Sequence, residues 1–83
     1  MSLRILYFAS LREALGVERE QLDLPEGVGS VVALRAHLLA RGSQWLPLSA
    51  PRIRTAVNQV LASDATSVVD GDEVAFFPPV TGG

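Results

Sequence analysis

The sequence ends in Pro78-Pro79-Val80-Thr81-Gly82-Gly83, and the carboxylate of this tail is the group best suited to chemistry. Two prolines hold the backbone extended and glycine has no Cβ, so we expect a narrow finger that projects from the domain. A terminal carboxylate is ionised at neutral pH and is a poor acyl electrophile until it is activated, usually as an adenylate. The sequence has neither a phosphate-binding loop motif nor a dinucleotide fingerprint. We therefore predict that another protein uses ATP to activate Gly83, whose carbonyl is then attacked by an amine or by sulfur.

The composition excludes several other classes of site. The 83 residues include no cysteine, which rules out disulfides and a thiol nucleophile, and the single histidine, His37, cannot form a metal site alone. A net charge of −2 with scattered arginines gives no basic field for nucleic acid. Apolar runs are too short to span a membrane and the N-terminus has no signal-peptide layout. We expect a cytoplasmic, soluble protein that binds no cofactor of its own.

Hydrophobic periodicity predicts one domain over residues 1–77, followed by the extended tail at residues 78–83. The expected strands lie at residues 3–8, 17–24, 52–58, 60–62 and 73–77, with the second of them at an edge of the sheet. A turn is expected at Asp70-Gly71-Asp72. One main helix can cover only one side of such a sheet, which predicts an α+β roll.

Two helices are expected from their terminal residues. Ser10 and Glu13 form a capping-box pattern, which predicts a short helix over Ser10–Leu15 that stops at Gly16. Ser30 is expected to cap the main helix, which runs through residue 41 and ends before a glycine. Trp45 follows in a proline-punctuated connection, where we expect it to pack against the core.

Charged residues indicate which side of the sheet faces away from the main helix. Arg4 in the first strand and Glu73 in the last strand mark that side. Alternation places on the same side Leu6, Phe8, Ala75 and Phe77. If the first and last strands are neighbours, Phe8 and Phe77 lie together beside the root of the tail, joined by Leu61. Because 48% of the residues are hydrophobic, which is high for so small a domain, we expect these three to form an exposed docking patch.

The whole sequence, from the first expected strand to the tail, resembles the small subunits of molybdopterin synthase, sulfur carriers of the ubiquitin-like β-grasp superfamily. The matching segments are Tyr7–Gly16, Ala56–Gln59 and Asp70–Gly83. Diglycine ends and Asp-Gly-Asp turns are shared with other β-grasp carriers, including those of the thiamine pathway. The ending Phe-Phe-Pro-Pro-Val-Thr-Gly-Gly is the part that resembles the molybdopterin branch specifically.

The resemblance implies a β-grasp roll with a mixed sheet of about five strands, and a function in molybdenum cofactor biosynthesis. The chain would be the sulfur-donating subunit of a sulfurtransferase and inert alone. A ubiquitin-activating-like adenylyltransferase would adenylate Gly83, and a sulfur-donating enzyme would complete its thiocarboxylate. The sulfur would pass to cyclic pyranopterin monophosphate, where it builds the dithiolene of molybdopterin.

The resemblance also implies which residues contact the partner. The tail residues that would thread the active site of the large catalytic subunit are Pro79, Val80, Thr81 and Gly82. Phe8, Leu61 and Phe77 would dock on that subunit, in an assembly expected to be a heterotetramer.

Chemistry alone leaves other functions open. A sulfur carrier could serve thiamine thiazole synthesis or tRNA thiolation, and a protein modifier could join its activated carboxyl to lysines. A plain interaction module would use the domain and not the tail. Only the resemblance favours delivery of sulfur to a pterin.

Overall fold

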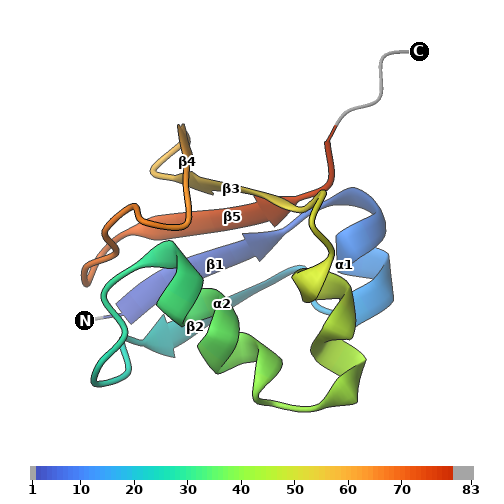
Figure 1. The fold of residues 1–83 in the computed structure, drawn as a ribbon, viewed down its shortest axis with the longest axis horizontal. Coiled ribbons are helices and arrows are strands. Elements are labelled where there is room, and N and C mark those ends of the chain that lie inside the picture. The colour runs from blue at the N-terminus through green and yellow to red at the C-terminus, as the bar shows by residue number, and fades with distance from the viewer. Residues whose placement is uncertain (1, 80–83) are drawn as a thin grey trace.

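The computed structural model of the protein describes residues 2–79, which form one five-stranded sheet with helices. In chain order the elements are β1 (Ser2–Tyr7), α1 (Ala9–Leu15), β2 (Arg19–Asp23), α2 (Val31–Leu39), the 3₁₀ helix η1 (Ser43–Ser49), β3 (Arg54–Val57), β4 (Val60–Ala62) and β5 (Glu73–Phe77). The strand order is β2-β1-β5-β3-β4, in which β1 and β5 are parallel and the other neighbours are antiparallel. Figure 1 shows α2 crossing in front of β2, with the yellow-green η1 segment beside α1. The predicted α+β roll with a mixed sheet is confirmed.

The core lies between the sheet and α2, as the alternating patterns predict. Leu3, Ile5 and Tyr7 of β1 are fully buried, and so are Val74 and Phe76 of β5. From the other side the core is completed by residues of α2 and η1, namely Val31, Leu34, Leu38, Trp45 and Leu48. Burial of these side chains is the main favourable free energy that holds the helix on the sheet.

The first helix starts differently from the capping-box prediction, which is wrong. Phe8 holds the N-cap position without a side-chain hydrogen bond, and Ser10 lies inside α1. The chain leaves β1 by a sharp turn at Ala9, whose φ of 54° lies in the left-handed region that costs an L-residue energy. Ser10 is therefore already helical, whereas an N-cap needs extended backbone. The predicted stop is correct, because Gly16 is left-handed and its N–H donates to the Arg12 carbonyl at 2.9 Å.

The main helix begins as predicted and ends earlier. The hydroxyl of Ser30 accepts a hydrogen bond from the N–H of Ala33 at 3.3 Å, which is the expected cap. Helix α2 ends at Leu39, so Arg41 lies beyond the helix rather than in its last turn. Trp45 is buried as expected, and the segment that carries it forms η1 rather than an irregular connection.

All five strands form near their predicted positions. β4 and β5 have the predicted bounds, β1 spans residues 2–7 rather than 3–8, and only β2 and β3 are shorter than predicted. β2 spans residues 19–23 rather than 17–24 and is an edge strand as predicted. β3 spans residues 54–57 rather than 52–58, because its hydrogen-bonded ladder with β5 begins at Arg54 and a tight turn follows Val57.

A polar cluster clamps β2 to the helix layer. The hydroxyl of Tyr7 donates to Glu20 Oε2 at 3.0 Å, and Arg41 donates to both Glu20 oxygens at 2.9 and 2.7 Å. The Arg41 guanidinium also stacks over the Trp45 ring, 4.7 Å from its centroid. Hydrogen bonds from Arg41 lower the pKa of Glu20, while burial raises the pKa of Tyr7. The Glu20 carboxylate therefore stays ionised, and the Tyr7 hydroxyl stays neutral and donates its hydrogen bond.

A second cluster joins the β3–β4 hairpin to the start of β5. Asn58 and Gln59, the two turn residues, both have positive φ, at 51° and 69°, as a tight hairpin turn requires. The Asn58 side chain donates to Asp72 Oδ1 at 2.9 Å and accepts from the N–H of Glu73 at 3.0 Å. Asp72 also accepts from the N–H of Val69 at 2.9 Å, which closes the turn before β5. Ala56–Gln59 and Asp70–Gly83, two of the segments that carry the resemblance, therefore meet in this cluster.

Candidate functional site

The face of the sheet that α2 leaves uncovered, called the open face below, carries a row of apolar side chains. The strand registers place Leu6 opposite Ala75, Ala75 opposite Ala56, and Ala56 opposite Leu61. The row therefore crosses the four strands β1, β5, β3 and β4 in a line. Leu61 is 70% exposed, and the two alanines are too small to shield the backbone around them. This row is an apolar surface on which another protein could pack closely.

Phe8 and Phe77 extend the row at the end of the sheet where β5 stops. The N–H of Phe8 donates to the carbonyl of Phe76 at 3.2 Å, which continues the parallel register one step beyond Tyr7 and Phe76. Phe8 is therefore level with Phe77, and alternation points both rings to the open face. Phe8 is 44% exposed and Phe77 is half-buried. The predicted neighbours are found together, because β1 and β5 are adjacent parallel strands.

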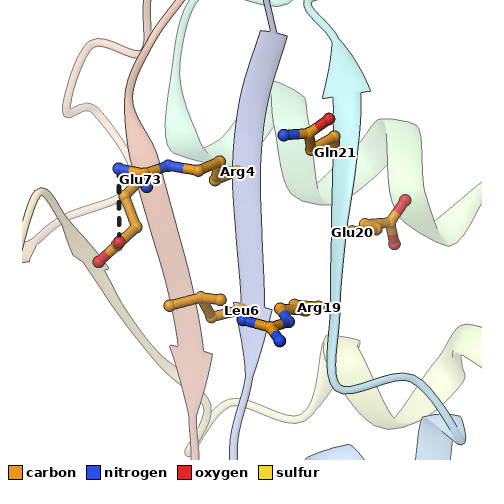
Figure 2. Close-up of a pocket in the computed structure, with 6 residues that line it drawn as sticks. All are labelled: Arg4, Leu6, Arg19, Glu20, Gln21 and Glu73. Atoms are coloured by element: carbon orange, nitrogen blue, oxygen red, sulfur yellow. Dashed lines mark ion pairs between the residues drawn. The ribbon is translucent and has the colours of Figure 1, made fainter.

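Charged side chains border the apolar row. Arg4 and Glu73 form an ion pair with 3.7 Å between Nη2 and Oε2, one step along the strands from Leu6 and Ala75. Figure 2 shows this pair beside Leu6, with Arg19 reaching from β2 toward the same leucine over a shallow hollow of the open face. Arg54 lies opposite Phe77 at the other side of the row. The site thus has an apolar centre and a polar rim, which is the usual anatomy of a protein interface.

The structure describes only the first two of the predicted tail residues, and Pro79 is the last residue that it describes. Pro78 and Pro79 are half-buried and follow directly on Phe77. The remaining predicted tail residues, Val80, Thr81, Gly82 and Gly83, lie outside the described residues. The division into a domain at 1–77 and a tail at 78–83 stays a prediction.

Three residues of the row were not among the predicted docking residues. Leu6 and Ala75 were already assigned to this face by alternation, and Ala56 follows by the same rule from Arg54. What the sequence lacked was the register that aligns all three with Leu61. Among residues 2–79 no group of three or more His, Cys, Asp or Glu side chains could hold a metal, and no helix is long and apolar enough to cross a membrane.

The sequence matches the model of the ThiS family over residues 5–83, which include all of the sheet except the first half of β1 and continue through the two C-terminal glycines. The chain belongs to the ThiS family. This ThiS-family chain is 44% identical over 84 residues to the molybdopterin synthase sulfur carrier subunit of Escherichia coli K12. That alignment covers 98% of the chain and 99% of the relative.

The fold of the chain is similar to that of several solved structures. The chain is similar to SAMP1 from Haloferax volcanii, with a TM-score of 0.76 and 26% identity over 100% of both chains. It is also similar to a chain in the complex of subunits 1 and 2 of molybdopterin-converting factor from Helicobacter pylori 26695. Here the TM-score is 0.69 and the identity 25%, again over 100% of both chains. The predicted ubiquitin-like β-grasp fold is confirmed.

Proposed function

We propose that this chain is the sulfur carrier subunit of a molybdopterin synthase. The observation that carries the proposal is the match of residues 5–83 to the ThiS family, together with the match of 98% of the chain to the Escherichia coli sulfur carrier subunit. The geometry supports it, because the apolar row and the Phe8–Phe77 pair lie where β5 leads into the tail. A partner docked there would meet the tail at its root.

The proposed chemistry takes place at the carboxyl group of Gly83. A ubiquitin-activating-like adenylyltransferase transfers AMP from ATP to this carboxylate and releases pyrophosphate. A sulfur-donating enzyme then provides the sulfur that displaces AMP and leaves a thiocarboxylate. The carrier delivers this sulfur to cyclic pyranopterin monophosphate in the active site of the large subunit. Because the cycle consumes ATP, we place it in the cytoplasm.

The open face is the proposed docking surface for the large subunit. Phe8 and Leu61 provide exposed apolar area, Phe77 adds a half-buried ring beside Phe8, and Ala56 and Ala75 allow close approach between them. A partner with an apolar centre and charges facing Arg4, Glu73 and Arg54 would match this rim. The tail residues Pro79 to Gly82 would then enter the active site of the large subunit, with two carriers in a heterotetramer. The Helicobacter pylori complex supports a partner of this class.

A second candidate function is protein modification, which the likeness to SAMP1, a protein named as a small archaeal modifier, favours. A modifier and a sulfur carrier share the adenylation step and differ in the nucleophile that follows. Sulfur carriers for thiamine thiazole or for tRNA thiolation differ only in the final acceptor.

One experiment separates these functions. The purified chain is incubated with ATP, its cognate adenylyltransferase and a sulfur donor, and its intact mass is measured. A sulfur carrier gains the mass difference between sulfur and oxygen at Gly83, and adding the large subunit with cyclic pyranopterin monophosphate then yields molybdopterin. Conjugates to lysines without any thiocarboxylate would instead identify a modifier. A thiocarboxylate that never yields molybdopterin would move the chain to another sulfur pathway.

A further inference from the structure

The edge strand β2 has backbone groups that the fold does not use. The β1–β2 register pairs Ser2 with Asp23 and Leu6 with Arg19, so Tyr7 falls opposite Glu18. The N–H of Tyr7 donates to the Glu18 carbonyl at 2.9 Å, which shows that Glu18 directs its backbone groups toward β1. In an antiparallel ladder this direction alternates along the strand. The N–H and C=O groups of Arg19, Gln21 and Asp23 therefore point away from β1, along the free edge.

The side chains of the same three residues lie on the open face and are exposed. Within residues 2–79, neither Arg19 nor Asp23 has a hydrogen-bonded or ion-pair partner for its side chain. Natural proteins protect long edge strands with proline, bulges or charges. β2 has no proline, and its five-residue register is unbroken, so its charges are the only such device within this strand.

The order of those charges makes the strand complementary to itself. In an antiparallel pair of two β2 strands centred on Gln21, Arg19 of one copy faces Asp23 of the other, and Asp23 faces Arg19. These are the positions whose backbone groups point outward, so each facing pair can exchange two hydrogen bonds. A parallel pair would instead bring Arg19 beside Arg19 of the second copy, where like charges repel.

The helix-side residues of β2 do not oppose this arrangement. Glu20 would face Leu22 of the second copy, and its carboxylate is already neutralised by two hydrogen bonds from Arg41 and one from Tyr7. The pair therefore leaves no new charge without a partner on that side.

From this edge we propose that a second copy of the chain pairs antiparallel with β2, joining two sheets through Arg19–Asp23 ion pairs around Gln21. Such a two-fold pair extends the sheet in its own plane. It leaves the apolar row from Leu6 to Leu61 and the C-terminal end of β5 uncovered on both copies. The second copy lies beside β2 at the edge of the sheet, whereas the row crosses the other four strands, β1, β5, β3 and β4, on the open face. The interface is small, so a weak and concentration-dependent dimer is expected.

Charge reversal tests the pairing with matched partners. Arg19→Asp and Asp23→Arg each turn both ion pairs into repulsive contacts, and each should weaken self-association roughly tenfold or more. Mixing the two variants puts an acidic edge against a basic edge, so a heterodimer should form at least as readily as the wild-type homodimer. Sedimentation equilibrium over a range of concentrations up to about 1 mM measures all three associations.

Two exposed residues outside β2 provide controls with equal charge changes. Arg52→Asp and Asp70→Arg should associate like the wild type. In the wild type, the amide protons of Arg19, Gln21 and Asp23 should gain protection from hydrogen exchange as concentration rises. A protein that stays monomeric at about 1 mM, or a dimer that both single variants leave unchanged, would overturn the proposal.

Discussion

Phe8 and Phe77 lie level with each other at the adjoining ends of the parallel strands β1 and β5. The hydrogen bond from the Phe8 N–H to the Phe76 carbonyl fixes this relationship, and both rings face away from the core. Phe77 is followed directly by the half-buried prolines Pro78 and Pro79, so the exposed Phe8, the half-buried Phe77 and the two prolines follow one another at this end of the sheet. A protein that covers the pair therefore lies next to Pro78 and Pro79.

Charge on the apolar row should weaken binding to the large synthase subunit. Leu61→Asp and Phe77→Asp each desolvate a carboxylate against an apolar surface, so each should cost about 1–3 kcal/mol of binding free energy. Titration calorimetry measures this. Leu46→Asp is the matched control, because Leu46 is 60% exposed and belongs to η1, away from the row. Wild-type affinity of Leu61→Asp would mean that the partner does not use this face.

Removal of Gly83 should abolish thiocarboxylate formation and leave the fold intact. The residue carries the proposed reactive carboxyl group and follows the described core, so its loss should change the free energy of unfolding by less than about 0.5 kcal/mol. Intact mass after reaction with ATP, adenylyltransferase and sulfur donor measures the chemistry. Gly29→Ala is the control, since a Cβ there meets open space and the reaction should proceed normally. A truncated chain that still gains sulfur would refute the role of Gly83.

Glu20→Gln should destabilise the fold by about 1–3 kcal/mol, because it weakens the charge-assisted bonds from Arg41 and alters the partner of Tyr7. Urea denaturation measures the loss. Glu18→Gln is the control. The Glu18 side chain is 69% exposed and lies 3.9 Å from Arg12, so its removal should cost less than about 0.5 kcal/mol. Equal costs for the two variants would show that the Glu20 clamp contributes little.

The clamp also predicts how stability depends on pH. Arg41 lowers the pKa of Glu20 in the folded protein, so the unfolded chain takes up a proton first as the pH falls. The contribution of Glu20 is therefore complete above its ordinary pKa of 4.5 and is lost as the pH drops through the lower folded pKa. Unfolding free energies measured between neutral pH and pH 3 should fall less steeply for Glu20→Gln than for the wild type. Parallel curves for the two proteins would contradict this assignment.

Gln59→Gly should stabilise the β3–β4 hairpin. Gln59 has a φ of 69°, which glycine adopts without the steric cost that a Cβ imposes, and Asn-Gly is the preferred pair in this turn. The expected gain is about 0.5–1 kcal/mol in thermal or urea unfolding. Gln21→Gly, the same change in the extended strand β2, should instead destabilise by about 0.5–1 kcal/mol. A loss at position 59 would mean that the Gln59 side chain contributes more than its backbone strain costs.

Features that depend on only a few neighbouring residues were predicted correctly from the sequence. Ser30 caps α2, Gly16 ends α1, and alternation assigned Phe8 and Phe77 to the open face, because each depends only on nearby backbone geometry. The capping box at Ser10 failed for a reason that lies outside its motif. The turn at Ala9, where the chain leaves β1, decides where α1 can begin.

The sequence by itself determined which side chains share a face and that two glycines follow the proline pair after the last strand. These follow from the period of two residues in a strand and from the order of residues. Only the tertiary structure decided that β1 and β5 are parallel neighbours, which brings Phe8 to Phe77 across more than sixty intervening residues. It also decided that Glu20 meets Arg41 and that Leu6 aligns with Leu61. Strand order and register depend on how all the elements bury their apolar faces together, and no local pattern encodes that arrangement.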